Sequence, residues 1–447
     1  MELSRREMLL KSSAALAGGT LLHYAGRAEA KEAVRAMDSP GGDPPWNRAA
    51  LEPGTSYQPV ITPDSTTLDY RIVDGVKVFH LTAEPVRHEF LPGLEANCWG
   101  YNGRVHGPTI EAVEGDRVRI YVTNKLPAAT TIHWHGAILP SGMDGVGGLS
   151  QSLIQPGETF KYEWTFAQHG TLMYHPHHDS MTQMGLGLMG MLIVHPRDPA
   201  AIPRVDRDFV LLLSEWFIKP GTERPDPNVM DDFNVLTINA RSFPGTSPLI
   251  AQKGDRVRIR IGNLSAMSHH PFHIHGHKFQ IAETDGGRIA PDSQWPETTA
   301  LVAVGQTRTI EFIADNPGDW AMHCHMTHHM MNQMGHGIPN MVGMDPEGLD
   351  ERVQSLLPDY MTMGHKGMGD HGMHIEMGHM DVPENSVPMV GARGPRDYMT
   401  MGGMATILKV RESIEDYDQD PGWYENPEGT EAKKASTREM ERDGIDA

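Results

Sequence analysis

The sequence predicts an all-β protein that contains two copies of one Greek-key β-sandwich domain. Short runs of alternating apolar and polar residues, among them 76–81 and 117–122, are separated by turn residues, which is typical of strands in a sandwich. The run GDRVRI occurs at 115–120 and again at 254–259, and in each copy a His-x-His-Gly motif follows at a similar distance. Farther on, GTLMYHPHH in the first copy parallels GDWAMHCHM in the second. Such an internal repeat indicates a duplicated domain.

The segments around these two domains differ from them in composition. A twin-arginine signal peptide is expected over 1–30, and 31–60, rich in Pro and Gly, is expected to be extended. The first domain is placed at 61–198 and the second at 205–345, each long enough for one sandwich. Beyond them, 346–447 is rich in Met and His with few aliphatic residues, so it is predicted to be a flexible C-terminal extension.

The N-terminus has the pattern of an export signal. Arg5 and Arg6 precede a weakly apolar run, 8–22, and Ala28–Ala30 fits a small-x-small cleavage site. An amphipathic first helix is the alternative interpretation. The run is shorter than the roughly 20 residues that a membrane-spanning helix requires, and no later segment reaches that length. We therefore expect export by the twin-arginine route to the periplasm or the cell exterior, without a membrane span.

Composition limits the classes of partner. The net charge of the 447-residue chain is −20 and no dense basic patch is present, so nucleic acid is not expected as a partner. Only two cysteines occur, and Cys98 has no evident disulfide partner, so it is expected to be a small buried side chain. The unusual counts are 25 histidines and 29 methionines, which point to metal ligation.

The second domain ends in a stretch rich in metal-ligating residues, 318–337. At its centre is the motif HCH at 323–325, and His329 and Met334 follow it. Blue copper sites, which transfer electrons, are built from two His, one Cys and a weak axial Met. Neighbouring residues of a strand point to opposite faces, so Cys324 can bind one copper ion while the histidines beside it bind others.

Three more His-x-His pairs precede this motif, at 133–135, 175–177 and 273–275. With four histidine signatures in this order, the sequence resembles the multicopper oxidases, the laccase-like family, over roughly residues 60 to 345. The resemblance implies a cupredoxin fold for both domains and four copper ions, one type 1 (blue), one type 2 and two type 3. It implies these ligands: for type 1, His270, Cys324, His329 and Met334; for type 2, His133 and His273; for type 3, His135, His175, His177, His275, His323 and His325.

Only the second domain keeps the residues of a blue site. When the two copies are aligned, Pro176 takes the place of Cys324 and Thr130 that of His270. This separates the chain from two-domain copper nitrite reductases, which keep type 1 copper in their first domain. Between His177 and His270 the chain is too short for the middle domain of a three-domain laccase. The chain thus resembles two-domain laccases, which implies a homotrimer with trinuclear copper clusters between subunits.

The trinuclear ligands by themselves require an interface. They come as two His pairs from each domain, so neither domain can complete the cluster alone. Whether the second domain comes from the same chain stays open in the sequence. Asp144, shortly after the first His pair, matches the acidic residue that the family uses as a proton relay, and a plain turn residue before Gly145 is the alternative.

These features predict a copper-dependent oxidase that couples one-electron oxidation of a donor to the four-electron reduction of dioxygen to water, with Cys324 passing electrons to the cluster. The favoured donors are phenols, as in laccases. A cuprous oxidase for copper tolerance is the alternative, because thioethers select Cu(I) and Met alternates with His and Gly over 359–404. A copper-sequestering protein is the alternative from another class, and Mn(II) stays open as a donor.

Overall fold

The computed structural model describes residues 43–335, 338, 348–358, 382–389 and 391–446. The chain divides into two compact units, Met1–Asn47 and Arg48–Ala447. Of the first unit only its end is described, with a short 3₁₀ helix, η1, at Pro45–Asn47. The expected signal peptide at 1–30 lies outside the described residues. Among the helices that are described, none is both long enough and apolar enough to cross a membrane.

The first domain consists of two sheets. One has the order β1-β2-β5-β7, with β3 paired to β2, and the other the order β4-β9-β8-β6. In β5 every second residue is buried, so Val118, Ile120 and Val122 face the other sheet. The bounds are β1 Arg71–Val73, β2 Val76–Leu91, β3 Leu94–Tyr101, β4 Ile110–Val113, β5 Arg117–Asn124, β6 His133–His135, β7 Thr159–Thr165, β8 Gly170–His175 and β9 Gly190–His195.

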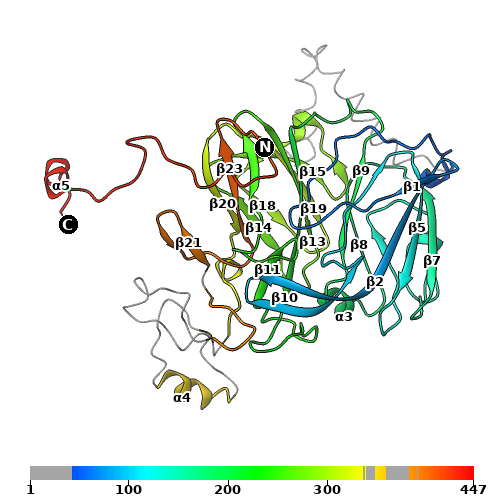
Figure 1. Cartoon of the computed structure of the whole chain (residues 1–447), viewed down its shortest axis with the longest axis horizontal. Coiled ribbons are helices and arrows are strands. Elements are labelled where there is room, and N and C mark those ends of the chain that lie inside the picture. The colour runs from blue at the N-terminus through cyan, green and yellow to red at the C-terminus, as the bar shows by residue number, and fades with distance from the viewer. Residues whose placement is uncertain (1–42, 336–337, 339–347, 359–381, 390, 447) are drawn as a thin grey trace, which may run out of the picture. The chain divides into compact units, whose positions relative to one another are not determined.

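The second domain repeats this arrangement. Its sheets have the orders β11-β10-β13-β19-β15-β16, with β17 paired to β15, and β12-β23-β20-β14-β18 (Figure 1). Phe272, Ile310 and Leu408 fill the core between them. The bounds are β10 Arg207–Trp216, β11 Val235–Ile238, β12 Leu249–Gln252, β13 Arg256–Asn263, β14 His270–Ile274, β15 Phe279–Thr284, β16 Gly287–Arg288, β17 Trp295–Glu297, β18 Thr299–Val302, β19 Thr307–Ile313, β20 Gly318–Cys324 and β23 Ala405–Arg411.

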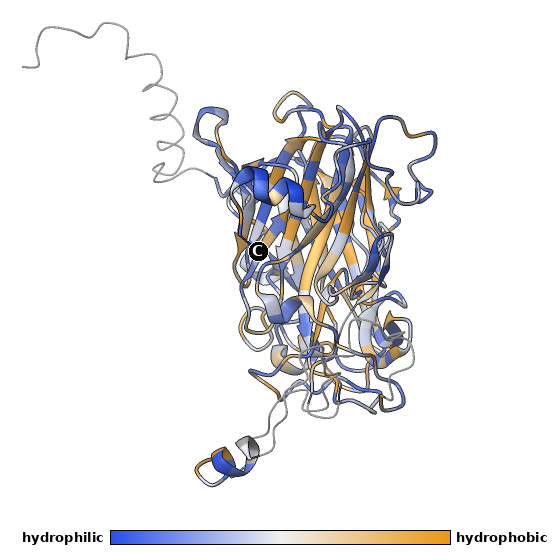
Figure 2. Cartoon of the chain, turned by 90° about the vertical axis from the view of Figure 1, so that its left-hand side faces the viewer, coloured by the Kyte–Doolittle hydropathy of each residue, from blue (hydrophilic) through white to orange (hydrophobic). Residues whose placement is uncertain are grey.

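Strand pairing confirms the predicted duplication. The two GDRVRI runs lead into β5 and β13, which pair in parallel with β2 and β10 respectively. The His-x-His strands β6 and β14 pair antiparallel with β8 and β20, with His133 opposite His175 and His273 opposite His323. The predicted all-β class with two cupredoxin-like Greek-key sandwiches is therefore confirmed. Figure 2 shows the apolar residues concentrated along the strands and the hydrophilic ones in the connecting loops.

Few helices occur among the described residues, and all of them are short. They connect strands or lie in the C-terminal part of the chain, where β21 (Ala392–Gly394) and β22 (Asp397–Met399) form a separate hairpin. Their bounds are η2 Ser141–Met143, α3 Ser180–Gly185, η3 Pro291–Ser293, η4 Thr327–Met330, α4 Leu349–Gln354 and α5 Thr437–Asp443.

The predicted flexible extension over 346–447 is wrong for Ala405–Arg411. This segment forms β23, which lies between β12 and β20 inside the second domain. Its apolar residues Leu408 and Val410 are fully buried. The strand was obscured because it is short and follows a long segment dominated by Met, His and Gly. The Met- and His-rich residues 359–381 lie outside the described residues.

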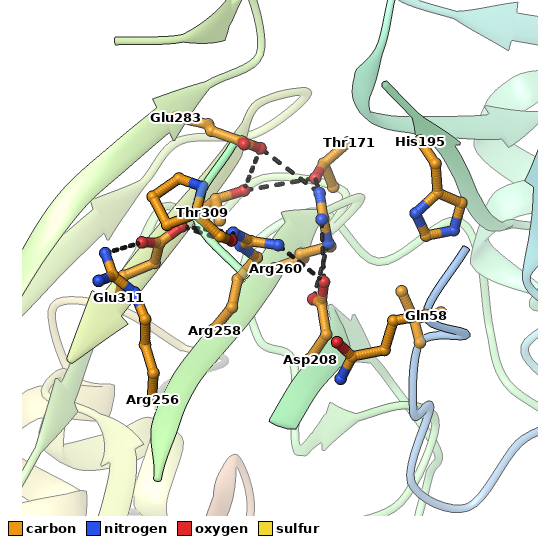
Figure 3. A network of polar contacts seen from close by, with 12 residues as sticks. Gln58, Thr171, His195, Asp208, Arg256, Arg258, Arg260, Glu283, Thr309 and Glu311 are labelled. Atoms are coloured by element: carbon orange, nitrogen blue, oxygen red, sulfur yellow. Dashed lines mark hydrogen bonds and ion pairs between the residues drawn. The ribbon is translucent and has the colours of Figure 1, made fainter. Parts of the chain in front are cut away.

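A buried polar network ties the two domains together (Figure 3). The Arg260 guanidinium of β13 donates to both carboxylate oxygens of Asp208, at 2.8 and 3.0 Å, and to Thr171 Oγ1 of the first domain at 2.9 Å. Thr307 Oγ1 donates to the Thr171 carbonyl at 3.0 Å. Because Arg260 is fully buried, its charge has to be paired, and the pairing holds β8 against the second domain.

Candidate metal centres

A thiol and two imidazoles converge at one end of the second domain. His270 begins β14, Cys324 ends β20, and His329 lies in η4. Cys324 Sγ lies 3.6 Å from His270 Nδ1 and 3.5 Å from His329 Nδ1, and the two nitrogens are 3.2 Å apart. A metal ion with bonds of about 2.0 Å to nitrogen and about 2.3 Å to sulfur in a trigonal plane requires separations of roughly 3.5 to 3.7 Å. The three atoms therefore fit a single metal ion.

The protonation of these side chains suits ligation. Ser265 Oγ lies 2.6 Å from His270 Nε2, which fixes the ring and leaves Nδ1 facing Cys324. Burial lowers the pKa of His270 to about 3 and that of His329 to about 4, so both imidazoles are neutral. Burial raises the pKa of the Cys324 thiol to about 12, so its thiolate form requires a bound cation.

The first domain gathers four histidines at the ends of β6 and β8. His135 Nδ1 lies 3.2 Å from His175 Nε2, and donor atoms of His133, His135 and His175 all lie within 4.8 Å of one another. The His177 ring centroid is 5.6 Å from that of His133. We call this group the first half-cluster: His133, His135, His175 and His177.

The second domain repeats the group on β14 and β20. His275 Nε2 lies 3.1 Å from His323 Nε2, and the His325 ring centroid is 5.5 Å from that of His273. We call this group the second half-cluster: His273, His275, His323 and His325. Cys324 ends β20 and lies between its members His323 and His325, so one strand end carries candidate ligands for two different centres.

Backbone carbonyls orient the histidines in the same way in both half-clusters. The first histidine of each His-x-His strand has its Nδ1 next to a loop carbonyl. The histidine paired with it on the neighbouring strand has its Nδ1 next to the carbonyl of the residue that directly follows it in the sequence. The nitrogen Nε2 is thereby left to face a metal ion. The contacts are His133 to Asp144 O at 2.8 Å, His273 to Thr298 O at 2.6 Å, His175 to Pro176 O at 2.9 Å and His323 to Cys324 O at 2.9 Å.

The two half-clusters lie against different ends of β18. His273 contacts Thr298, which precedes this strand, whereas His135 lies beside Gly305, which follows it. The four residues of β18 that follow Thr298 correspond to roughly 13 Å. Donor atoms that share a metal ion lie within about 4 Å of one another. The two half-clusters of one chain therefore lie against opposite ends of this strand.

Comparison with known proteins agrees with these centres. Family models described as multicopper oxidase match residues 82–199 and residues 220–342. The chain belongs to the multicopper oxidases. It is 28% identical to copper resistance protein A of Escherichia coli over 68% of this chain and 57% of that protein. It is 34% identical to laccase-15 of Oryza sativa subsp. japonica over 48% of this chain and 38% of that protein.

A solved structure gives the same result for the fold. The blue copper oxidase from Nitrosomonas europaea is 29% identical, with a TM-score of 0.55, over 74% of this chain and 85% of that one. The chain spans 57% and 38% of the lengths of these two curated relatives. The family implies copper as the metal, and the paired imidazoles and the thiol fit copper by their chemistry.

Asp144 contacts the first half-cluster with its side chain as well as its backbone. Its Oδ1 lies 3.3 Å from His133 Nδ1, and the carboxylate is about one-third exposed. The following Gly145 has φ +84°, and a Cβ there would lie 1.6 Å from the Ile132 carbonyl oxygen. The turn therefore holds Asp144 against His133. This geometry is compatible with both the predicted proton relay and a plain turn residue.

At the position of the blue site, the first domain of this multicopper oxidase is satisfied by hydrogen bonds. Thr130 Oγ1 donates to Gln183 Oε1 at 2.6 Å, and Gln183 Nε2 donates to the Ala129 carbonyl at 2.9 Å. Pro176 stands where the second domain has Cys324. The other cysteine, Cys98, is a buried free thiol, as expected.

No contact between the predicted ligand Met334 and His270, Cys324 or His329 is seen among the described hydrogen bonds. Met334 follows η4, is half-buried, and its carbonyl accepts from Asn234 Nδ2 at 3.3 Å. Sequence reasoning missed the groups that orient the ligands, namely the Ser265 hydroxyl and the loop carbonyl of Thr298. The serine five residues before His270 is a signal that could have been used, whereas a carbonyl leaves none.

Proposed function

We propose that this protein is a laccase-like oxidase that takes single electrons from a phenolic donor at His270, Cys324 and His329 and reduces dioxygen to water at the eight histidines. The observation that carries the proposal is the position of Cys324 between two histidines of the second half-cluster on β20. Copper, when bound, supplies one-electron redox chemistry and dioxygen binding. The complete set is one type 1, one type 2 and two type 3 ions.

The chain's own residues position the ligands and supply protons. The backbone contacts fix the orientation of the imidazoles, and burial of Cys324 and His270 excludes water from the donor site. Reduction of dioxygen to water consumes protons, and Asp144 delivers them from solvent, since its carboxylate is partly exposed and touches His133. The resemblance to the family indicates Met334 as the axial ligand.

We further propose that the cluster is completed between subunits of a homotrimer. The position of the two half-clusters against opposite ends of β18 supports this, because a second chain could then bring one half-cluster against the other. The test uses two inactive variants, His135→Ala/His175→Ala and His275→Ala/His323→Ala. Each variant alone is expected to lack oxygen uptake.

Co-expression of the two variants distinguishes the arrangements. If clusters form between chains, random assembly leaves about one quarter of the interfaces with both intact half-clusters, and about one quarter of the wild-type uptake returns. If each cluster is built within one chain, no mixture regains activity. Sedimentation of the same samples reports the number of subunits.

The oxidase activity is tested by oxygen uptake of the copper-loaded full chain with a simple phenol or Cu(I) as donor. Phenol-dependent uptake with water as the product is expected. Uptake with Cu(I) alone favours the cuprous oxidase instead. Copper binding without uptake from either donor would leave a copper-sequestering protein.

One observation favours the cuprous oxidase as a second candidate. The chain that follows the Met- and His-rich residues 359–381 contacts the loop that carries His329. Asn332 N donates to the Met389 carbonyl at 2.7 Å, and Val387 N donates to Gln333 Oε1 at 3.2 Å. Thioethers select Cu(I), so methionines tethered here are suited to deliver it.

A substitution series tests this role without removing β23. Replacing Met361, Met363, Met368, Met373, Met377 and Met380 by Leu keeps the length and apolar character of the segment but removes the thioethers. Loss of Cu(I) turnover with phenol turnover retained would assign the segment to Cu(I) delivery. If the variant oxidises each donor as fast as the wild type does, the segment does not deliver Cu(I).

Export by the twin-arginine route remains a proposal that rests on Arg5 and Arg6. Replacing both by Lys is expected to keep the precursor inside the cell, as measured by fractionation. Undiminished export of this variant would contradict the proposal.

A further inference from the structure

The last strand of the cupredoxin fold begins at very different points in the two domains. In the first domain β8 ends at His175 and β9 begins at Gly190, whereas in the second β20 ends at Cys324 and β23 begins only at Ala405. β9 lies between β4 and β8, and β23 lies between β12 and β20, so they are counterparts. The second domain therefore carries a long insertion between its ligand loop and its last strand.

The counterpart strands identify matching residues next to the blue site. Leu188 N donates to the Gln183 carbonyl at 3.1 Å in the first domain, and Met404 N donates to the His329 carbonyl at 2.8 Å in the second. Gln183 takes the place of His329, since its side chain contacts Thr130 as His329 contacts His270. Met404 thus occupies the position of Leu188.

The ladder between β20 and β23 sets the direction of the Met404 side chain. His323 is paired with Ala405, and residues directly opposite each other share a face of the sheet. One residue farther along, Cys324 N donates to the Met404 carbonyl at 3.0 Å, so these two side chains share the other face. Met404 is fully buried and packs in the same apolar cluster as Cys324 and Phe272.

A glycine corner holds Met404 against the ligand loop. Gly402 N donates to the Met330 carbonyl at 2.7 Å, and Gly403 N donates to Asn332 Oδ1 at 2.8 Å. Gly403 has φ +58°, and a Cβ there would lie 2.4 Å from the His329 carbonyl oxygen. Only glycine allows this close approach, so the corner is shaped to bring the next residue to the site.

Met334 lies on a part of the loop that is anchored elsewhere. The preceding Gln333 donates from Nε2 to the Ile218 carbonyl at 2.9 Å, and Asn234 donates to the Met334 carbonyl. Met334, which the family resemblance made the expected ligand, is five residues after His329, the same spacing as Gln183 to Leu188. The insertion breaks that correspondence, because the strand that follows is β23.

We propose that Met404, not Met334, supplies the axial thioether of the type 1 site. The inference rests on the proposed binding of copper by His270, Cys324 and His329. A weak axial thioether stabilises the oxidised ion and sets the potential of the site. In the sequence, the Met- and His-rich segment then lies between the third ligand and the axial one.

The test compares Met404→Leu, Met404→Gln and Met334→Leu in the copper-loaded full chain. The readouts are the electron paramagnetic resonance spectrum, the blue absorption and a redox titration of the type 1 site. Met404→Leu removes a donor, so the equilibrium constant for reduction is expected to rise about tenfold, equivalent to about 59 mV for one electron. Met404→Gln provides a stronger donor and is expected to shift the potential the opposite way. Met334→Leu is expected to change none of the three readouts.

The outcomes separate this inference from the proposed function. A shift with Met334→Leu, or unchanged spectra and potential in both Met404 variants, would overturn the axial assignment while leaving a blue copper protein. If Met404→Gln does not fold, Met404→Leu decides alone, because it nearly conserves volume. A wild-type protein with no blue signal would overturn the proposed function, and the axial assignment with it.

Discussion

The two domains place different residues on one framework at the position of the blue site. In the first, Thr130 and Gln183 satisfy each other by a 2.6 Å hydrogen bond. In the second, His270, Cys324 and His329 bring donor atoms to within 3.6 Å of one another. Buried polar atoms need partners, and either a hydrogen bond or a metal ion provides them. The fold therefore tolerates loss of the metal site wherever polar side chains replace it.

The domains also differ in how they use the arginines of the repeated GDRVRI run. In the first, Arg117 and Arg119 bind Glu163 near the surface, at 2.8 and 2.6 Å. In the second, Arg258 binds Glu311 at 2.8 Å with both side chains only 3% exposed. Both copies of the repeat keep the ion pair. In the second domain the pair is buried (Figure 3), so removing one partner costs more stability there than in the first domain.

Truncation after Asp345 is expected to have the largest effect. It removes β23, so the second domain loses a central strand whereas the first keeps β9. Burial of Met404, Leu408 and Val410 contributes about 1.5–3 kcal/mol each, which is comparable to the whole stability of a domain. We expect the second domain to unfold, as measured by calorimetry and copper content.

The matched truncation after Glu425 leaves β23 in place. The residues that follow Glu425 are mostly exposed, so this shorter protein is expected to melt and bind copper as the full chain does. Normal folding of the protein cut after Asp345 would show that β23 is dispensable.

Cys324→Ser is expected to remove the blue centre and reduce donor-dependent oxygen uptake to background. The hydroxyl cannot replace the soft thiolate, and the electron path to His323 and His325 is lost. Copper content is expected to fall by about one ion per chain. Cys98→Ala is the control, because Cys98 is buried among apolar residues, and it should keep colour and uptake. Blue absorption in Cys324→Ser would contradict the ligand assignment.

Much of the fold and most of the site could be predicted because both are encoded locally. The alternation in 117–122 and the repeated GDRVRI run predict two sandwiches, since strand burial follows a two-residue period. The same period predicts that Cys324 faces away from its two histidine neighbours. The ladder that pairs His273 with His323 confirms that these histidine strands are adjacent.

The rest depended on pairing that is distant in sequence. β23 joins β20 across a long Met- and His-rich segment, and no local pattern reports which strand it joins. The groups that orient His133 and His273 are carbonyls of Asp144 and Thr298, and any residue type supplies a carbonyl. If Met404 is the axial ligand as proposed, the spacing of Met334 from His329 points to the wrong residue, because an insertion leaves spacing intact on one side only.

Asp144→Asn is expected to lower oxygen uptake by about 100-fold, a typical loss for a positioned proton donor, with the blue absorption unchanged. The second domain supplies the comparison. There, the group beside His273 Nδ1 is the Thr299 hydroxyl, at 2.9 Å, which cannot carry an acidic proton. Thr299→Val is therefore expected to change uptake by only a few-fold. Unchanged uptake in Asp144→Asn would remove the relay role.

The smallest effect concerns stability. Glu311→Gln removes the carboxylate that Arg258 and Arg288 share, while Asp208 and Glu283 still pair with them, and is expected to cost about 3 kcal/mol of unfolding free energy at pH 7. Glu163→Gln, in the solvated counterpart, is expected to cost less than about 1 kcal/mol. Urea unfolding of both variants and the wild type measures the difference. Equal losses would mean that burial at the junction does not strengthen the pair.

The pH dependence of unfolding tests whether the charge of Glu311 stabilises the protein. Burial by itself raises the pKa of Glu311, but the hydrogen bond from Arg288 and the charge of Arg258 outweigh it and lower the pKa to about 2. A carboxyl whose pKa falls on folding stabilises the protein above its unfolded value of about 4.3, and this stabilisation is lost as the pH falls towards 2. The gap between wild type and Glu311→Gln should therefore be full at pH 7 and shrink between about pH 5 and pH 2. A gap that stays constant over this range would show that Glu311 acts through packing rather than charge.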